Sequence, residues 1–131
     1  MVIGLGIDII EIDRIKESVE KYGDKFLKKV YTKLELDYCL SKKNKNQHLA
    51  ARFAAKEAIY KALASGWDEN MSWQDIEISN LPNGLPVVKL SGKLQRVLTK
   101  EKRIRISMSH SRDYVACVAI VYKGDSESEG E

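Results

Sequence analysis

The chain has 131 residues, 44% of them hydrophobic and 31% charged, and its net charge is +3. This length and composition predict a single soluble globular domain and exclude a chain that is disordered over most of its length. The longest apolar run, residues 114–122, is much shorter than the roughly 18–20 residues that a membrane-spanning helix needs. The N-terminus also lacks the basic segment of a secretory signal, so we expect a cytoplasmic protein with no membrane partner.

The charge is unevenly distributed along the chain. Residues 124–131 carry four acids and no base, so the total of +3 leaves +7 on residues 1–123. We expect one folded domain over residues 1–123 and a solvated, disordered acidic tail over residues 124–131. A basic body favours anionic partners, which include phosphates, nucleic acids and acidic proteins. The two cysteines, Cys39 and Cys117, are not spaced like metal ligands and are predicted to be reduced structural thiols.

The first half of the chain predicts one strand followed by helices. The β-branched run 2–10 predicts a buried strand, and apolar residues at three- and four-residue spacings predict a helix over 12–30, interrupted at Gly23. Thr32 and Glu35 form a capping box for a short helix over 33–40. A basic loop over 42–45 precedes an alanine-rich helix over 48–65, which ends before Gly66.

The second half of the chain is richer in strands. Alternation predicts strands at 75–79 and 103–110, and further strands are predicted at 86–90, after a turn-rich loop, and over the apolar run 114–122. Ser91 is predicted to cap a short helix that reaches Leu98. The last strand is apolar on both faces, so it is either central in the sheet or buried at an interface. This order predicts an α+β fold with a mostly antiparallel sheet packed with helices, because a doubly wound parallel sheet needs strict alternation of strands and helices.

Asp8 is the first residue whose position is unexpected. It lies between isoleucines in a strand that is predicted to be buried, and a buried carboxylate needs a cation, a metal ion or several N–H donors. Taken alone, the residue is equally consistent with a strand end from which it caps the next helix.

Glu57 and Lys61 are notable for their positions on the alanine-rich helix. At 3.6 residues per turn, Glu57 lies about 40° from Phe53, inside the apolar stripe. Lys61 follows one turn later at the edge of the stripe, where an ordinary exposed ion pair is also a good explanation. Two acids in apolar settings beside a lysine and a basic body suggest a hard cation such as Mg²⁺ that in turn holds phosphates.

His110 ends the strand over 103–110 on the same face as Ile106 and Met108. A single histidine in that position is more often a structural residue than a ligand or a base. Zinc is disfavoured, because the chain has only two histidines and its cysteines are badly placed.

Three segments together resemble the 4′-phosphopantetheinyl transferases. They are GIDIIEIDRI at residues 6–15, RFAAKEAIYKAL at 52–63 and SMSHS at 107–111. The short, single-domain branch of the family, the holo-acyl-carrier-protein synthases, fits best, and the similarity extends from about residue 2 to residue 122. The segments are specific in combination, whereas FAAKEA alone is only suggestive.

The resemblance implies an α+β fold and a Mg²⁺-dependent enzyme of fatty acid biosynthesis. Members of the family move the phosphopantetheine arm of coenzyme A onto a serine hydroxyl of apo-acyl carrier protein and release adenosine 3′,5′-bisphosphate. Short members are homotrimers with active sites between subunits. Phosphoryl transfer of this kind depends on charge neutralisation and in-line placement. The group that accepts the serine proton stays open between a metal-bound water or hydroxide and one of the two acids.

The resemblance also implies roles for individual residues. Asp8 and Glu57 match the metal-binding acids, Lys61 matches the lysine near the transferred phosphate, and His110 matches the coenzyme-binding histidine of the third segment. Arg14 matches a basic residue used in carrier docking. The coenzyme pocket is expected to include Arg52 and the turn residues Asn83, Gly84 and Pro86. One departure from the family pattern is Leu85, where this turn often carries a basic residue.

The first long helix carries a basic stripe that suits an acidic carrier protein. Three- and four-residue steps place one serine and four cations along it: Arg14, Ser18, Lys21, Lys25 and Lys28. An ordinary solvated helix face would look the same, so the docking role depends on the substrate that the resemblance implies.

Two other interpretations remain open at this point. A small basic RNA-binding domain would explain the charge, but it leaves two acids in apolar settings unexplained, and no aromatic stacking platform is visible. A coenzyme-A-binding module without activity would keep the same fold, although every acid and base of the motifs is present. We therefore expect no nucleic-acid partner.

Overall fold

The structure is a computed structural model that describes residues 1–63, 72–99 and 101–124. Its elements, in chain order, are β1 (Val2–Glu11), α1 (Ile12–Tyr22), α2 (Asp24–Val30), α3 (Lys33–Leu40), α4 (Lys45–Ala62), a 3₁₀ turn (Trp73–Asp75), β2 (Ile76–Asn80), β3 (Pro86–Leu90), α5 (Leu94–Val97), β4 (Lys102–His110) and β5 (Tyr114–Lys123). This is the α+β fold that the order of predicted elements indicates. The acidic residues of the expected tail, 125–131, lie outside the described residues.

The strands form two separate antiparallel sheets. One sheet has the order β1-β5-β4 and the other is the hairpin β2-β3. Strand β5, which is apolar on both faces, is therefore central in its sheet. This confirms the first of the two positions expected for it, central in the sheet or buried at an interface. Its register places Cys117 opposite Asp8 on β1 and opposite Met108 on β4. Both cysteines are free and buried, as expected.

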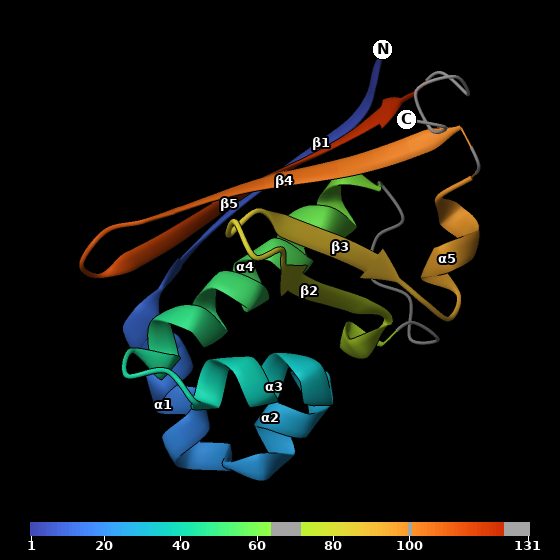
Figure 1. Cartoon of the computed structure of the whole chain (residues 1–131). Helices are drawn as coiled ribbons and strands as arrows, with labels where there is room; N and C mark the ends of the chain where they lie inside the picture. The colour runs from blue at the N-terminus through green and yellow to red at the C-terminus, as the bar shows by residue number, and fades with distance from the viewer. Residues whose placement is uncertain (64–71, 100, 125–131) are drawn as a thin grey trace.

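Helix α4 is the element around which the other elements pack. It runs along the three-stranded sheet and also contacts α1, α3 and β2 (Figure 1). Two glycines of β1 allow the helix to approach the strand closely. A Cβ at Gly4 or Gly6 would overlap the backbone carbonyl oxygens of Ala62 or Ala58. Gly4 and Gly6 thus serve backbone packing between β1 and α4.

A fully buried ion pair fixes α3 against α4 and β2. Lys56 Nζ lies 2.8 Å from Glu35 Oε1, and both side chains are completely buried. The lysine also donates to the carbonyl oxygens of Trp73 and Ile76, while the carboxylate accepts from the backbone N–H of Ile78. Burial lowers the pKa of Lys56, although Glu35 opposes the shift. The pair is not evident from the sequence, because Lys56 directly precedes Glu57 on an alanine-rich helix and no local pattern indicates that it is buried.

Several predicted boundaries differ from the observed ones. Helix α4 begins at Lys45 and ends at Ala62, so the predicted basic loop is one residue shorter and Gly66 lies outside the described residues. The short helix α5 begins at Leu94 after Lys93, so Ser91 does not cap it. The predicted interruption at Gly23 is confirmed: this residue has a φ of 55° and separates α1 from α2. A left-handed φ favours glycine, because a side chain there clashes with the backbone.

No helix among the described residues is long and apolar enough to cross a membrane.

Candidate active site

Asp8, Glu57 and Lys61 form an acidic cluster where β1 meets α4. Lys61 Nζ lies 3.3 Å from Asp8 Oδ1 and 3.0 Å from the carbonyl oxygen of Ile7. The Asp8 side chain is 18% exposed and that of Lys61 is 53% exposed, so this ion pair is open to solvent on one side. Asp8 is thus less buried than its place between two isoleucines predicts.

The two carboxylates of the cluster influence each other. Partial burial raises the pKa of Glu57, the negative charge of Asp8 raises it further, and Lys61 lowers it. The position of Glu57 inside the apolar stripe of α4 therefore brings it beside Asp8 and not into solvent. Two neighbouring acids with a single lysine leave negative charge uncompensated, and a divalent cation would compensate it.

The donor set of this cluster suits magnesium. Its ligands would be carboxylate oxygens from Asp8 and Glu57, and the described residues hold no group of three or more histidines, cysteines or acids that could bind a metal ion. Magnesium is usually held by one or two carboxylates with substrate phosphates and waters. The thiol opposite Asp8 does not change this, because burial raises the pKa of Cys117 to about 12 and keeps it protonated. The residues present therefore fit Mg²⁺.

A second set of polar residues surrounds Arg52. A cavity of about 190 Å³ is lined from α3, α4, β2, β4 and β5, and its polar side chains are Tyr38, Gln47, His48, Arg52, Asn80, Ser109 and His110. Arg52 and His110, both expected to bind coenzyme, thus lie at one cavity. His48 was not predicted as a site residue, although its i,i+4 spacing from Arg52 places the two on one helix face.

Arg52 is buried and incompletely paired. Its residue is 3% exposed, and its Nε has no hydrogen-bond partner among the described residues. Its guanidinium lies 4.4 Å from the ring centre of Tyr38, and its Nη2 donates to Asn80 Oδ1 at 2.7 Å. A buried guanidinium with an unused donor is expected to bind an anion.

The predicted coenzyme turn is connected to Arg52 through one residue. Asn80 accepts from Arg52 and donates from Nδ2 to the carbonyl oxygen of Gly84 at 3.0 Å. Asn83 Oδ1 accepts from the backbone N–H of Leu85, which closes the turn. Asn83, Gly84 and Leu85 are exposed and Pro86 is half-buried, so the turn is accessible beside the arginine.

The acidic cluster and the Arg52 cavity lie on different sides of one helix. At 100° per residue, Arg52 is about 140° from Glu57 around α4. Neither Asp8, Glu57 nor Lys61 lines the cavity that holds Arg52 and His110. A single chain therefore does not bring all the predicted site residues together.

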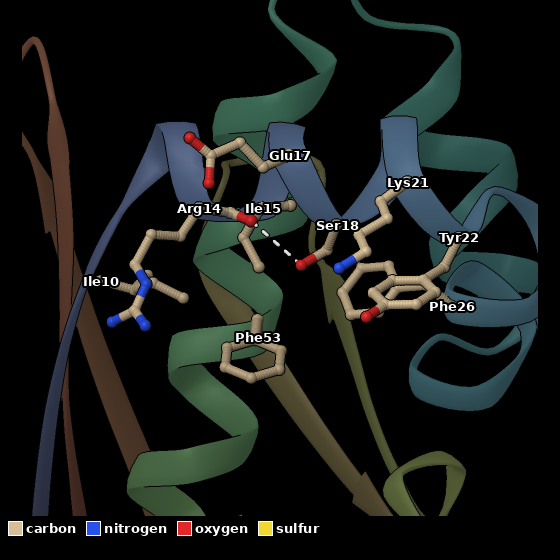
Figure 2. A pocket seen from close by; sticks show the side chains of 9 residues that line it. All are labelled: Ile10, Arg14, Ile15, Glu17, Ser18, Lys21, Tyr22, Phe26 and Phe53. Carbon is tan, nitrogen blue, oxygen red and sulfur yellow. Dashed lines mark hydrogen bonds between the residues drawn. The ribbon is translucent and has the colours of Figure 1, made fainter.

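A groove of about 520 Å³ runs along α1 and contains most of the predicted docking residues. Figure 2 shows Arg14 and Lys21 on either side of Ser18, above the ring of Phe53 from α4. Ser18 Oγ donates to the carbonyl oxygen of Arg14 at 3.1 Å. The expectation of one continuous stripe is wrong for its second half, because the chain breaks at Gly23 and Lys25 belongs to α2, outside this groove.

Known proteins resemble this chain over most of its length. The family model of the 4′-phosphopantetheinyl transferase superfamily matches residues 4–119. The chain is 47% identical over 120 residues to a holo-[acyl-carrier-protein] synthase from Protochlamydia amoebophila, covering 92% of this chain and 98% of the relative. It belongs to this superfamily.

The fold of this 4′-phosphopantetheinyl transferase is also similar to solved structures. A holo-[acyl-carrier-protein] synthase from Neisseria meningitidis superposes with a TM-score of 0.86 at 31% identity, covering 94% of this chain and all of the relative. One from Helicobacter pylori, solved with coenzyme A, gives a TM-score of 0.78 at 32% identity over 90% of this chain and 99% of the relative. By sequence and by fold, this transferase is thus similar to holo-[acyl-carrier-protein] synthases.

Proposed function

We propose that this enzyme transfers the 4′-phosphopantetheine group of coenzyme A to a serine hydroxyl of apo-acyl carrier protein. The reaction depends on Mg²⁺, releases adenosine 3′,5′-bisphosphate and serves fatty acid biosynthesis in the cytoplasm. The observation that carries the proposal is the cluster of Asp8, Glu57 and Lys61, which combines two carboxylates with one half-exposed ammonium group. The free, buried thiols agree with a reducing compartment.

The acidic cluster holds the metal in this proposal. Asp8 and Glu57 would bind Mg²⁺, which supplies positive charge to the phosphate oxygens of the coenzyme when bound. Lys61 is half exposed and bound to Asp8, so its ammonium group can turn from the carboxylate to the phosphate on which negative charge develops. The serine oxygen bonds to the phosphorus that carries the pantetheine arm, and the bond from that phosphorus to the nucleotide breaks.

The Arg52 cavity binds another part of the coenzyme. Arg52, His110 and the turn residues Asn83, Gly84 and Pro86 form the expected coenzyme site. Coenzyme A carries a pyrophosphate and a separate phosphate monoester on its ribose. Since the pyrophosphate must lie at the acidic cluster, the cavity with the incompletely paired guanidinium suits the monoester. Leu85 offers no cation at this turn, so Arg52 supplies the positive charge there, with His110 beside it in the same cavity.

We further propose a homotrimer in which each active site lies between two subunits. The face of the sheet turned away from α4 is apolar and open, with Leu5, Ile7 and Ile9 each more than 60% exposed. Their partners on β5, Ile120, Val118 and Ala116, extend the same face. A contiguous apolar surface of this kind is typical of an interface, and the resemblance gives the number three. A neighbouring subunit would bring its Arg52 cavity to the acidic cluster.

The groove along α1 is the proposed docking site for acyl carrier protein. Arg14 and Lys21 supply exposed positive charge at its rim, and Ser18 lies between them. The apolar floor is formed by Ile15, Phe26 and Phe53. Glu17 also lines the groove, so its rim carries two cations and one acid. A rim with this net positive charge and an apolar floor fits an acidic helical partner, whose encounter the cations would accelerate.

One experiment tests the transfer directly. The protein is mixed with coenzyme A, Mg²⁺ and apo-acyl carrier protein, and the carrier mass is measured. We expect the carrier to gain the mass of one phosphopantetheine group and adenosine 3′,5′-bisphosphate to accumulate in equal amount. Chelation of the metal should stop both. An unchanged carrier mass with coenzyme still bound would support the inactive coenzyme-binding module, and salt-dependent binding of bulk RNA would support the nucleic-acid interpretation.

A further inference from the structure

We propose that His48 is a coenzyme-binding residue: with Arg52 and His110 it binds the ribose phosphate monoester of coenzyme A, and protonation of its imidazole strengthens that binding. This inference rests on the proposed function, because it concerns the cavity assigned there to the coenzyme. His48 matches none of the residues on which the resemblance depends.

The geometry of the cavity places His48 among cations. His48 lies one helical turn before Arg52 on α4, and the two line the same cavity as His110 from β4. Its ring meets that of Tyr38 edge to face at 5.5 Å between ring centres. Lys42 Nζ lies 4.6 Å from the centre of the same tyrosine ring. The aromatic ring of Tyr38 thus contacts a histidine, a lysine and an arginine, of which the histidine and the arginine line the cavity.

The charge around His48 is uncompensated within the part of the chain that the structure describes. The charged or titratable groups that face it are Tyr38 and Lys42 from the end of α3 and the turn after it, Arg52 from its own helix and His110 from β4. No acid lines the cavity. Burial lowers the pKa of His48, and Arg52, Lys42 and His110 lower it further. These causes favour the neutral imidazole of His48 in the free protein.

A phosphate monoester reverses this balance. Its double negative charge favours the protonated imidazole, so coenzyme binding takes up a proton near neutral pH. The sign follows directly: affinity for coenzyme A rises as the pH falls from 8.0 to 6.5. A coenzyme that lacks the ribose phosphate gains nothing from protonation of His48. The residue thus contributes to the selection of coenzyme A over its 3′-dephosphorylated form.

The test compares wild type with His48→Phe, which keeps the edge-to-face ring contact with Tyr38 and removes the imidazole. We expect His48→Phe to raise the KM for coenzyme A about tenfold at pH 6.5 and less at pH 8.0. The effect should fall on KM and not on kcat, and the KM for 3′-dephospho-coenzyme A should stay the same. Lys33→Gln is the control for loss of one positive charge, because Lys33 is 90% exposed and lies outside the cavity.

Calorimetry in buffers of different ionisation enthalpy measures the proton uptake without turnover. We expect wild type to take up a proton on binding coenzyme A at pH 7 and His48→Phe to take up less. Equal KM values for wild type and His48→Phe at both pH values, unchanged proton uptake, or an equal rise of KM for both coenzymes would overturn the role of His48. If wild type binds coenzyme A with proton uptake but modifies no carrier, the proposed function fails while the role of His48 stands.

Discussion

At the scale of single residues, the polar groups of this protein divide into those that are satisfied internally and those that are not. Lys56 and Glu35 use their charges on each other and on backbone groups, and both are fully buried. Arg52 keeps an unused buried donor, and Asp8 and Glu57 lie close enough to raise the pKa of Glu57. The incompletely satisfied groups are the ones that suit a bound anion or cation, because a ligand lowers their free energy most.

The acidic cluster gives the first prediction. Asp8→Asn and Glu57→Gln should each reduce transfer by more than about a hundredfold at low Mg²⁺, because each removes a metal ligand. Glu57→Gln should also raise the thermal midpoint of the metal-free protein, since it removes one of two neighbouring negative charges. Thermal unfolding in chelator and in Mg²⁺ measures this, and Mg²⁺ should no longer stabilise the variant. Near-full activity of either variant would contradict the metal assignment.

The buried ion pair gives the second prediction. Lys56→Met should lower the free energy of unfolding by about 3 kcal/mol, because it leaves the Glu35 carboxylate buried without a counter-charge. Adding Glu35→Gln to that variant should recover much of the loss, since a neutral amide costs less to bury. Urea unfolding at a fixed protein concentration measures both. A loss below about 1 kcal/mol in the single variant would show that backbone N–H groups alone stabilise the carboxylate.

At the scale of elements, α4 carries most of the chemistry. One face of α4 carries His48 and Arg52, which line the cavity. Another face carries Glu57 and Lys61, nearer the end of the helix. The glycines of β1 allow the helix to lie close to the strand, and this contact brings Asp8 beside Glu57 and Lys61. Helix α1 lies against the same helix, so that Phe53 of α4 forms the floor of the groove along α1.

The break at Gly23 gives the third prediction, which concerns the docking groove. Reversing Arg14 and Lys21 to glutamate should raise the KM for apo-carrier at least about tenfold at low ionic strength and leave the KM for coenzyme A unchanged. The matched control is reversal of Lys25 and Lys28, which lie on α2 and do not line the groove. This control should have a clearly smaller effect. Equal effects of the two double variants would show that the carrier spans both helices.

At the scale of the whole molecule, two features of the single chain motivate the proposed homotrimer. The outer face of the three-stranded sheet exposes Ile7, Ile9 and Leu5, each more than 60% accessible to solvent. The acidic cluster and the Arg52 cavity lie on different sides of α4, and neither Asp8, Glu57 nor Lys61 lines that cavity. The proposed cyclic assembly would cover the apolar face and would join each cluster to the cavity of a neighbour.

Mixed assemblies give the last prediction. Chains carrying Asp8→Asn and chains carrying Arg52→Ala should each be nearly inactive alone. When the two are unfolded together and refolded as a mixture, activity should return, because some interfaces then join an intact acidic cluster to an intact Arg52 cavity. Light scattering should give the mass of a trimer for every variant. A stable, fully active monomer, or a mixture as inactive as its components, would contradict shared active sites.

Much of the fold and of the site could be predicted from the sequence. Period-3.6 spacing predicted α1 and period-2 alternation predicted β2 and β4, because local hydrophobic spacing is enough to define which face of an element is buried. The capping box predicted α3, and an apolar run predicted β5. The acids were found because Asp8 and Glu57 occur where apolar residues are expected. Element ends were less predictable: α4 begins at Lys45 in a polar segment where no periodicity marks the start.

Other features depended on the tertiary structure alone. The pairing of Lys56 with Glu35 joins residues 21 positions apart, and the cavity around Arg52 is assembled from five separate elements. No local pattern encodes such contacts, since they arise when chain segments that are distant in sequence pack together. The sequence by itself determined the family, the elements and the acids that suit a metal. Only the packing of α4 decided that Asp8 meets Glu57 and Lys61, and that Arg52 and His48 face away from them. The surroundings of a helical side chain depend on the element against which that face of the helix packs.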